Sequence, residues 1–171
     1  MLTRLNQPAA AGLDAISSAR ELIERSALRA HFQPIVELVG AQVWAHEALI
    51  RTPPGCPLRS PQALFAAAHQ EGLGAELELE CLYQALRDWS DGPCIGKLFL
   101  NISAPTLLKA AHGEGLTRFI DQVRTLGLSL ASIVFELTEH EHAHDIAPVL
   151  ALVERLRRLG AALALDDFGD G

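Results

Sequence analysis

The sequence lacks several features that would place the chain in other protein classes. It has only three cysteines, Cys56, Cys81 and Cys94, which are odd in number and form no CxxC pair. This pattern argues against a disulfide framework and favours reduced thiols. The longest purely apolar runs, such as residues 161–165, are too short to span a bilayer, and no apolar stretch follows a basic start as in a signal peptide. The expected location is therefore the cytoplasm, with no membrane segment.

Long basic runs are also missing. No five consecutive residues are Lys or Arg, and the formal net charge is −7. Proteins that bind long nucleic acids usually carry a basic stripe, so binding to a DNA or RNA backbone is not expected. An acidic chain can still bind a small anion if metal ions and one or two local arginines supply positive charge.

The composition is that of one globular domain with a substantial core, because 49% of the 171 residues are hydrophobic and 20% are charged. Residues 1–13 are rich in Ala, Pro, Gly and Gln and are predicted to be a disordered segment, which leaves 14–171 as the domain. Asp14 is a predicted helix cap, and Ser60 with Pro61 is a predicted cap and first-turn pair. The predicted helices cover residues 14–28, 60–70, 75–89, 115–126 and 145–159. The predicted strands cover residues 31–38, 42–50, 97–101, 132–137 and 162–166.

Strands and helices alternate at intervals of roughly thirty residues, which is the βαβ pattern and predicts parallel strands. The strands are apolar, and helices on both faces of the sheet would fit a sheet that is buried on both sides. This pattern predicts an α/β fold. It leaves a doubly wound sheet and a TIM-type barrel as alternatives.

Polar side chains occur near the ends of four predicted strands: Glu47, Asn101, Glu136, and the adjacent Asp166 and Asp167. Each residue alone could be an ordinary surface residue. In parallel α/β folds, however, ligands bind at the carboxyl edge of the sheet. Carboxylates gathered there would repel one another without cations, and Mg²⁺ or Mn²⁺ prefers such an oxygen-rich set. The pattern therefore predicts a divalent-metal site at that edge.

Five sequence blocks carry a resemblance to a known family. They read FQPIVEL, HEALIR, LFLNIS, FELTE and LALDDFG, and they extend from about residue 32 to residue 169. In order and spacing they resemble the EAL family, which is named after the tripeptide found here as Glu47-Ala48-Leu49. The resemblance implies a modified TIM (β/α)8 barrel of EAL type, incomplete here with about five strands present. It also implies a phosphodiesterase that hydrolyses cyclic di-GMP to linear pGpG.

The resemblance implies a role for each of the strand-end residues. Glu47, Asn101, Glu136 and Asp166 would hold one Mg²⁺ or Mn²⁺ ion, and Asp167 would bind mainly a second one. Glu47, Asp166 and Asp167 are accordingly the expected catalytic residues of a two-metal site. Two divalent ions suit this reaction because they activate water and stabilise charge on the attacking and leaving oxygens.

Further roles follow from the same resemblance. Gln33 and Leu49 would line the nucleotide site, Arg51 would contact a ligand phosphate, and Glu139 would support the loop after the fifth strand. Asp170 departs from the family, whose loop usually reads DDFGTG where this chain reads DDFGDG. Besides cyclic di-GMP, the expected partners are a second copy of the domain in a homodimer and a downstream regulatory or GGDEF-type domain.

Three alternatives remain open on the sequence alone. The family pattern continues with three more strands that carry a catalytic lysine, another acidic ligand and a glutamine. This chain is therefore expected to be a fragment, or to be completed by another chain, and to be inactive alone. An EAL-like domain can also be a catalytically inactive cyclic di-GMP receptor or an interaction module. Residues 140–144 match the zinc motif H-E-x-x-H, but that motif needs a helix and here it directly follows a predicted strand.

Overall fold

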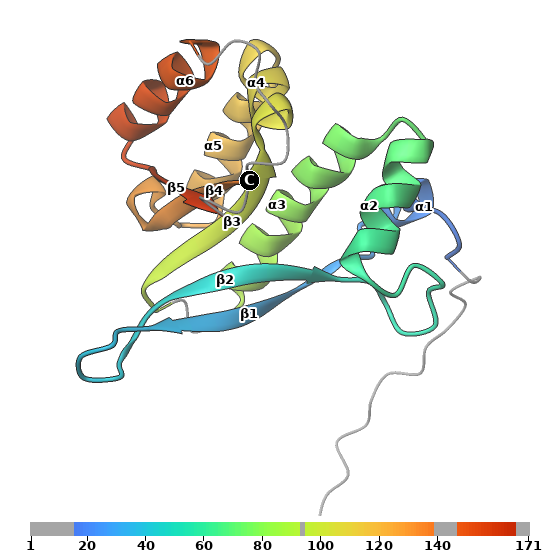
Figure 1. Ribbon diagram of the computed structural model, residues 1–171, viewed down its shortest axis with the longest axis horizontal. Helices are drawn as coiled ribbons and strands as arrows, with labels where there is room; N and C mark the ends of the chain where they lie inside the picture. The colour runs from blue at the N-terminus through green and yellow to red at the C-terminus, as the bar shows by residue number, and fades with distance from the viewer. Residues whose placement is uncertain (1–15, 93–94, 139–146, 167–171) are drawn as a thin grey trace, which may run out of the picture.

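The computed structural model of the chain describes residues 16–92, 95–138 and 147–166. These residues form one five-stranded sheet with the strand order β1-β2-β3-β4-β5, together with the helices shown in Figure 1. The elements in chain order are α1 (Ala19–Glu24), β1 (Arg29–Val36), β2 (Val43–Arg51), α2 (Pro61–Gln70), α3 (Gly74–Ser90), β3 (Lys97–Ser103), α4 (Ala104–His112), α5 (Gly115–Thr125), a 3-10 turn (Leu130–Ser132), β4 (Ile133–Thr138), α6 (Ala147–Arg158) and β5 (Ala162–Asp166).

Four of the strands are parallel, as the βαβ spacing predicts: β2 pairs with β3, β3 with β4, and β4 with β5. The first strand runs the other way, because β1 and β2 form an antiparallel hairpin. Its turn includes Gly40 at a φ of +95°, and the Glu37 N–H donates to the Gln42 carbonyl at 2.9 Å. A turn this short can join only antiparallel neighbours.

Side chains alternate between the two faces of the sheet, and one face is covered by helices. The main core combines outward-facing strand residues, such as Leu100 and Phe135, with residues of α3, α4, α5 and α6, such as Phe119 and Leu156. These helices lie together on one side of the sheet (Figure 1). A second core, which includes Leu22 and Leu64, joins α1 and α2 to α3.

The opposite face carries a much smaller apolar cluster made of Ala45, Phe99 and Val134. In the described part of the chain this cluster contains strand residues and none from a helix. The prediction of helices on both faces of the sheet is therefore wrong. The mistake arises because a strand lining the inside of a barrel is as apolar as a strand covered by helices. One-sided covering favours the barrel over the doubly wound sheet.

The helix caps confirm part of the sequence prediction. Ser60 caps α2, since its hydroxyl accepts the Ala63 N–H at 3.1 Å, and Pro61 is the first residue of the helix. The first helix is shorter than predicted and begins at Ala19, capped by Ser18 rather than by Asp14. Asp14 lies outside the described residues. Glu71 adds a long-range cap, because its carboxylate accepts the backbone N–H groups of Ala19 and Arg20 at 3.0 Å.

Helix α4 is absent from the sequence prediction, although its start has the same chemistry as that of α2. Ser103 is its cap and accepts the Thr106 N–H at 3.3 Å, and Pro105 lies in the first turn. The helix follows β3 without a connecting loop. Because the apolar strand pattern continues directly into it, the boundary is hidden in the sequence.

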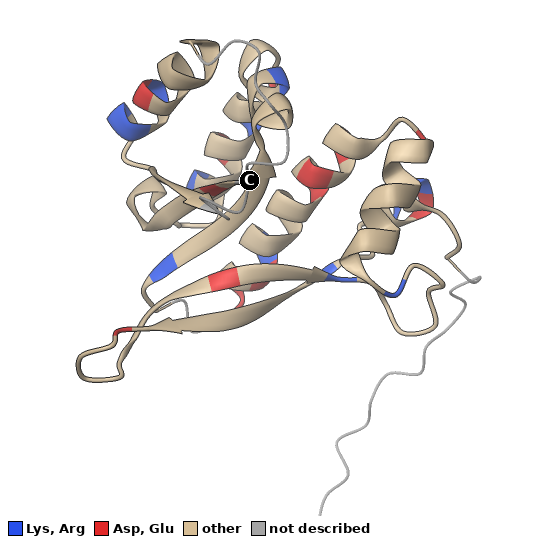
Figure 2. Ribbon diagram, viewed as in Figure 1, with Lys and Arg blue, Asp and Glu red and all other residues tan. Residues whose placement is uncertain are grey.

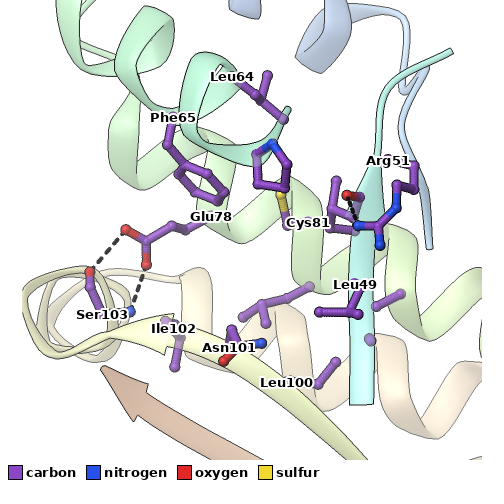
Figure 3. A pocket seen from close by; sticks show the side chains of 15 residues that line it. Leu49, Arg51, Leu64, Phe65, Glu78, Cys81, Leu100, Asn101, Ile102 and Ser103 are labelled. Atoms are coloured by element: carbon purple, nitrogen blue, oxygen red, sulfur yellow. Dashed lines mark hydrogen bonds between the residues drawn. The ribbon is translucent and has the colours of Figure 1, made fainter. Parts of the chain in front are cut away.

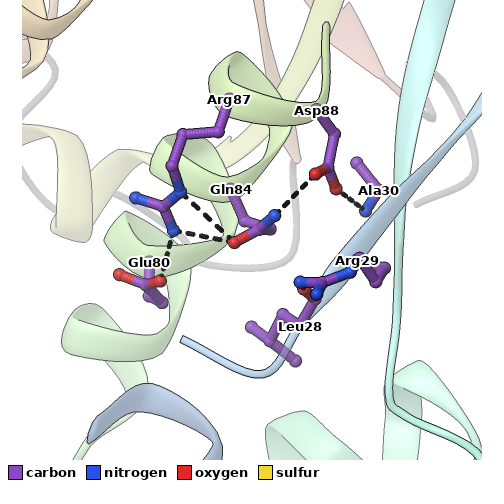
Figure 4. Close-up of polar contacts among 7 residues, drawn as sticks. All are labelled: Leu28, Arg29, Ala30, Glu80, Gln84, Arg87 and Asp88. Carbon is purple, nitrogen blue, oxygen red and sulfur yellow. Dashed lines mark hydrogen bonds and ion pairs between the residues drawn. The ribbon is translucent and has the colours of Figure 1, made fainter. Parts of the chain in front are cut away.

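A polar network joins α3 to β1 (Figure 4). Asp88 accepts the Ala30 backbone N–H at 2.7 Å through one carboxylate oxygen and the Gln84 amide at 2.7 Å through the other. Gln84, only 4% exposed, also accepts from Arg87, which forms an ion pair with Glu80 at 2.7 Å. The network satisfies buried polar groups that would otherwise destabilise this contact.

None of the described helices combines the length and apolar composition that a membrane crossing needs. Lys and Arg residues are scattered over several helices and strand ends rather than gathered on one face (Figure 2).

Replacing Gly96 with alanine should destabilise the fold. Gly96 precedes β3 with a φ of +85°, and an added Cβ would lie 2.3 Å from the Trp44 carbonyl oxygen. An alanine in this left-handed backbone conformation is strained, and its Cβ also clashes with the carbonyl. Together these effects predict a loss of about 2–4 kcal/mol in the free energy of unfolding, which urea titration would measure. Gly72→Ala is the matched control, because its φ is +69° and no atom lies within 4 Å of the added Cβ. Equal losses in the two variants would contradict the clash.

Cys81 should be unreactive in the folded protein. Burial raises the pKa of its thiol, and the nearby Glu78 and Glu80 carboxylates raise it further. Because the thiolate is the reactive form, iodoacetamide at pH 8 should modify Cys81 far more slowly in buffer than in urea. Mass spectrometry of the digested protein would measure the two rates. Similar rates would show that the thiol is accessible.

Candidate functional site

Strands β2 and β3 separate toward their carboxyl ends. They are paired at three positions, and the last pair is Glu47 with Phe99. In contrast, β3 and β4 stay paired over six positions, ending at Ser103 with Thr138. The separation leaves room for a cavity of about 320 Å³ between the ends of β2 and β3 and the helices α2 and α3 (Figure 3).

Two of the predicted metal ligands meet beside this separation. The Asn101 side-chain Nδ2 donates a hydrogen bond to Glu47 Oε1 at 2.8 Å, and both residues are partly buried. They are 54 positions apart in sequence and come from neighbouring parallel strands. The third predicted ligand, Glu136, is in register with Asn101 on β4.

Strand register places these side chains on the face of the sheet that carries no helices. Asn101 is two residues after Phe99, so both side chains point to the same face, and register partners in a sheet share a face. Gln33 is paired with Glu47 across the hairpin and lies on that face too. Gln33, Glu47, Asn101 and Glu136, from β1, β2, β3 and β4, thus lie on one face of the sheet.

The remaining predicted residues are only partly described. The backbone of Asp166 ends β5 in register with Thr138, at the same edge of the sheet, but its side chain lies outside the described part of the structure. Asp167, Glu139 and Asp170 also fall outside the described residues, as does the H-E-x-x-H segment at 140–144.

The cavity brings together two of the three residues predicted to bind the substrate and one predicted metal ligand, whereas Gln33 is not part of its lining. Leu49, Arg51 and Asn101 line it from the strand side, and Leu64 and Phe65 line it from α2. The Arg51 guanidinium Nη1 donates to the Ile50 carbonyl at 2.9 Å, which leaves its other nitrogens for further donor bonds. The cavity therefore pairs an apolar wall with a cation at its edge, a combination suited to a base and a phosphate.

Glu78 is a site residue that the sequence analysis does not identify. It lines the cavity from α3, and its carboxylate accepts two hydrogen bonds from Ser103, at 2.7 Å from the backbone N–H and at 2.9 Å from the hydroxyl. In the sequence it is the middle acid of the run ELELE, between the exposed Glu76 and the ion-paired Glu80. Nothing in that pattern distinguishes it from its neighbours.

The donor set fits a hard divalent cation. Glu47 and Glu136 supply carboxylate oxygens, and Asn101 carries an amide oxygen besides the nitrogen bonded to Glu47. Oxygen ligands of this kind are those that Mg²⁺ and Mn²⁺ prefer. Among the described residues, no three His, Cys, Asp or Glu side chains gather closely enough to hold a metal by themselves. A complete set therefore needs ligands beyond these described carboxylates.

Sequence comparison finds relatives with a stated activity. The cyclic di-GMP phosphodiesterase NbdA of Pseudomonas aeruginosa is 31% identical over 157 residues, which cover 89% of this chain and 20% of that protein. The bifunctional diguanylate cyclase/cyclic di-GMP phosphodiesterase MucR of the same species is 30% identical over 176 residues, covering 98% of this chain and 25% of that protein. The chain thus spans about a fifth to a quarter of the length of these relatives.

Comparison of folds gives the same family. Klebsiella pneumoniae BlrP1, solved as a complex with manganese and cyclic di-GMP, matches with a TM-score of 0.73 and 29% identity over 85% of this chain and 36% of BlrP1. The predicted fold class is confirmed, because the five-stranded sheet and its one-sided helices match part of that structure. The model of the EAL domain matches residues 16–171. The chain therefore belongs to the EAL domain family.

Proposed function

We propose that this protein is a metal-dependent phosphodiesterase that hydrolyses cyclic di-GMP to linear pGpG in bacterial second-messenger signalling in the cytoplasm. The observation that carries the proposal is the hydrogen bond from Asn101 to Glu47, which brings two expected ligands together at the carboxyl ends of parallel strands. The adjoining cavity, with Leu49 and Arg51 in its lining, supports a nucleotide beside them. The manganese and cyclic di-GMP bound to BlrP1 also support it.

The chain's own carboxylates and the Asn101 amide would hold the metal. Glu47, Asn101, Glu136 and Asp166 would bind one Mg²⁺ or Mn²⁺, and Asp167 would bind mainly the second. Bound divalent ions would supply Lewis acidity that activates water and stabilises charge on the leaving oxygen. The Asn101 amide, by donating to Glu47, orients that carboxylate and so acts before any cation arrives.

The substrate would be held by residues on both sides of the metal ligands. Arg51 would donate to a phosphate oxygen, where a guanidinium can form two parallel bonds. Leu49 and Gln33 would contact the nucleotide, Leu49 from the cavity and Gln33 from the neighbouring strand in register with Glu47. Glu139 would support the loop after the fifth strand.

We also propose that the domain acts beside others. A homodimer through the EAL domain and a downstream regulatory or GGDEF-type domain are the partners we expect. The two activities in the name of MucR support a combination of synthesis and hydrolysis in one protein.

The proposal is tested by incubating the protein with cyclic di-GMP and Mn²⁺ or Mg²⁺ and measuring pGpG by chromatography. This 171-residue chain and the full product of its reading frame are assayed in parallel. Formation of pGpG by the full product supports the enzyme. Binding of cyclic di-GMP without formation of pGpG would identify a receptor. If neither protein binds cyclic di-GMP, both the enzyme and the receptor hypotheses are refuted.

Glu47→Gln should weaken Mn²⁺ binding and hydrolysis together. The substitution keeps the size of the side chain but removes the charge that attracts the cation. Because even outer partners of a metal site are worth about 10–100-fold in affinity, we expect at least that loss in calorimetric Mn²⁺ titrations. Glu37→Gln, on the exposed hairpin turn, is the matched control. Unchanged Mn²⁺ affinity in Glu47→Gln would exclude Glu47 as a ligand.

Arg51→Ala should weaken binding of cyclic di-GMP while leaving Mn²⁺ binding intact. Loss of a charge-assisted bond to phosphate is worth about 1.5–3 kcal/mol, or roughly 10–150-fold in Kd by calorimetry. Arg29 provides a close control, because it is paired with Arg51 across the hairpin and its Nη1 donates to a neighbouring carbonyl in the same way. It does not line the cavity. An equal effect of Arg29→Ala would point to general charge rather than to a phosphate contact.

A further inference from the structure

The carboxylate of Glu78, on α3, bonds a single residue of β3 twice. Its Oε2 accepts the Ser103 backbone N–H at 2.7 Å, and its Oε1 accepts the Ser103 hydroxyl at 2.9 Å (Figure 3). Ser103 is also the cap of α4, since its Oγ accepts the Thr106 N–H at 3.3 Å. One half-buried carboxylate thus fixes the junction where β3 ends and α4 begins. Negative charge is favourable there, because the N–H groups of the helix start point toward it.

This junction lacks support from β2. The ladder between the two strands stops at Glu47 and Phe99, four residues before Ser103, and the cavity occupies the space beyond. On its other side β3 remains paired with β4 as far as Ser103. The carboxyl end of β3 is therefore held on one edge by backbone bonds and on the other by side chains only.

Asn101 lies within this stretch, two residues before Ser103 on the same face of the strand. Its amide donates a hydrogen bond to Glu47 at 2.8 Å. This side-chain bond joins β3 to β2 where the two strands separate. The position of that amide depends on the direction in which β3 leaves the ladder. The bonds from Ser103 to Glu78 fix this direction. The hydrogen bond from Asn101 to Glu47 therefore depends on them.

We propose that Glu78 is a positioning residue: by binding Ser103 through both carboxylate oxygens, it holds the end of β3 so that Asn101 stays against Glu47. The inference rests on the proposed function, in which Glu47 and Asn101 hold a metal ion. Glu78 itself is not assigned as a ligand, because both of its oxygens are engaged by Ser103.

The test compares Glu78→Gln with Glu76→Gln on the same helix. Glutamine keeps the length of the side chain but replaces one acceptor oxygen with an NH₂ group, which cannot accept a bond from Ser103. Glu76 is the matched control, because its carboxylate forms an exposed ion pair with Lys109 at 2.9 Å, away from Ser103. In calorimetric titrations with Mn²⁺ alone, Glu78→Gln should raise the Kd about tenfold, as loss of an outer partner does, and Glu76→Gln should not change it.

A second measurement needs no metal. The side-chain NH₂ protons of Asn101, assigned by NMR in the metal-free chain, should show shifts typical of a hydrogen-bonded amide in the wild type and in Glu76→Gln. In Glu78→Gln they should move toward the shifts of a free amide. A role in stability alone would lower the unfolding midpoint without moving these signals or changing the Mn²⁺ affinity of the folded protein.

Each result of these measurements either supports or overturns the positioning role of Glu78. Unmoved Asn101 signals in folded Glu78→Gln would overturn the positioning role. If the wild type does not bind Mn²⁺, the proposed metal site is refuted. The Asn101 signals still test the positioning role of Glu78, because they are measured without metal. If Glu78→Gln does not fold, Ser103→Ala takes its place. It keeps the backbone N–H bond to Glu78 and removes the hydroxyl, with its bonds to Glu78 and to Thr106. It should move the Asn101 signals in the same direction by a smaller amount, and unmoved signals would again overturn the proposal.

Discussion

The alternation of side chains along β3 is the constraint on which the site depends. Leu98, Leu100 and Ile102 face the helices and belong to the main core, whereas Phe99 and Asn101 face the other way. Burial of the first set fixes the register of the strand, because a slip of one residue would exchange the two faces. The apolar core thus determines where the polar amide points. A change that preserves this core therefore keeps Asn101 on the face of the sheet opposite the helices.

Sequence reasoning predicts most of the elements, and its failures have physical causes. The strand positions and the Ser60 cap could be read from local patterns. The covering of only one face could not, because a barrel interior and a helix-covered face are equally apolar. Helix α4 is not visible in the sequence pattern, because it begins at the residue immediately after the end of β3.

Glu78 shows a different kind of limit. The positioning role that we propose for it depends on Ser103, 25 residues away, and on the absence of a β2 partner at that point. Neither fact is expressed in the local sequence, where Glu78 is one of three alternating acids. By contrast, Glu47 and Asn101 are recognisable because each lies in a block with its own residue pattern. Candidate ligands can therefore be proposed from motifs, whereas the contact between Glu78 and Ser103 is recognised only from the fold.

The bond from Asp88 to the Ala30 N–H has a consequence for the outer edge of the sheet. Backbone nitrogens alternate in direction along a strand, so residues 30, 32 and 34 of β1 all present theirs away from β2. Ala30 is already occupied by Asp88, and Pro34 has no hydrogen to donate. Within the described residues, Phe32 is the one of these three whose N–H remains available to an incoming strand. The amino-terminal half of β1 is thus a poor template for edge-to-edge aggregation, although it is the first strand of the sheet.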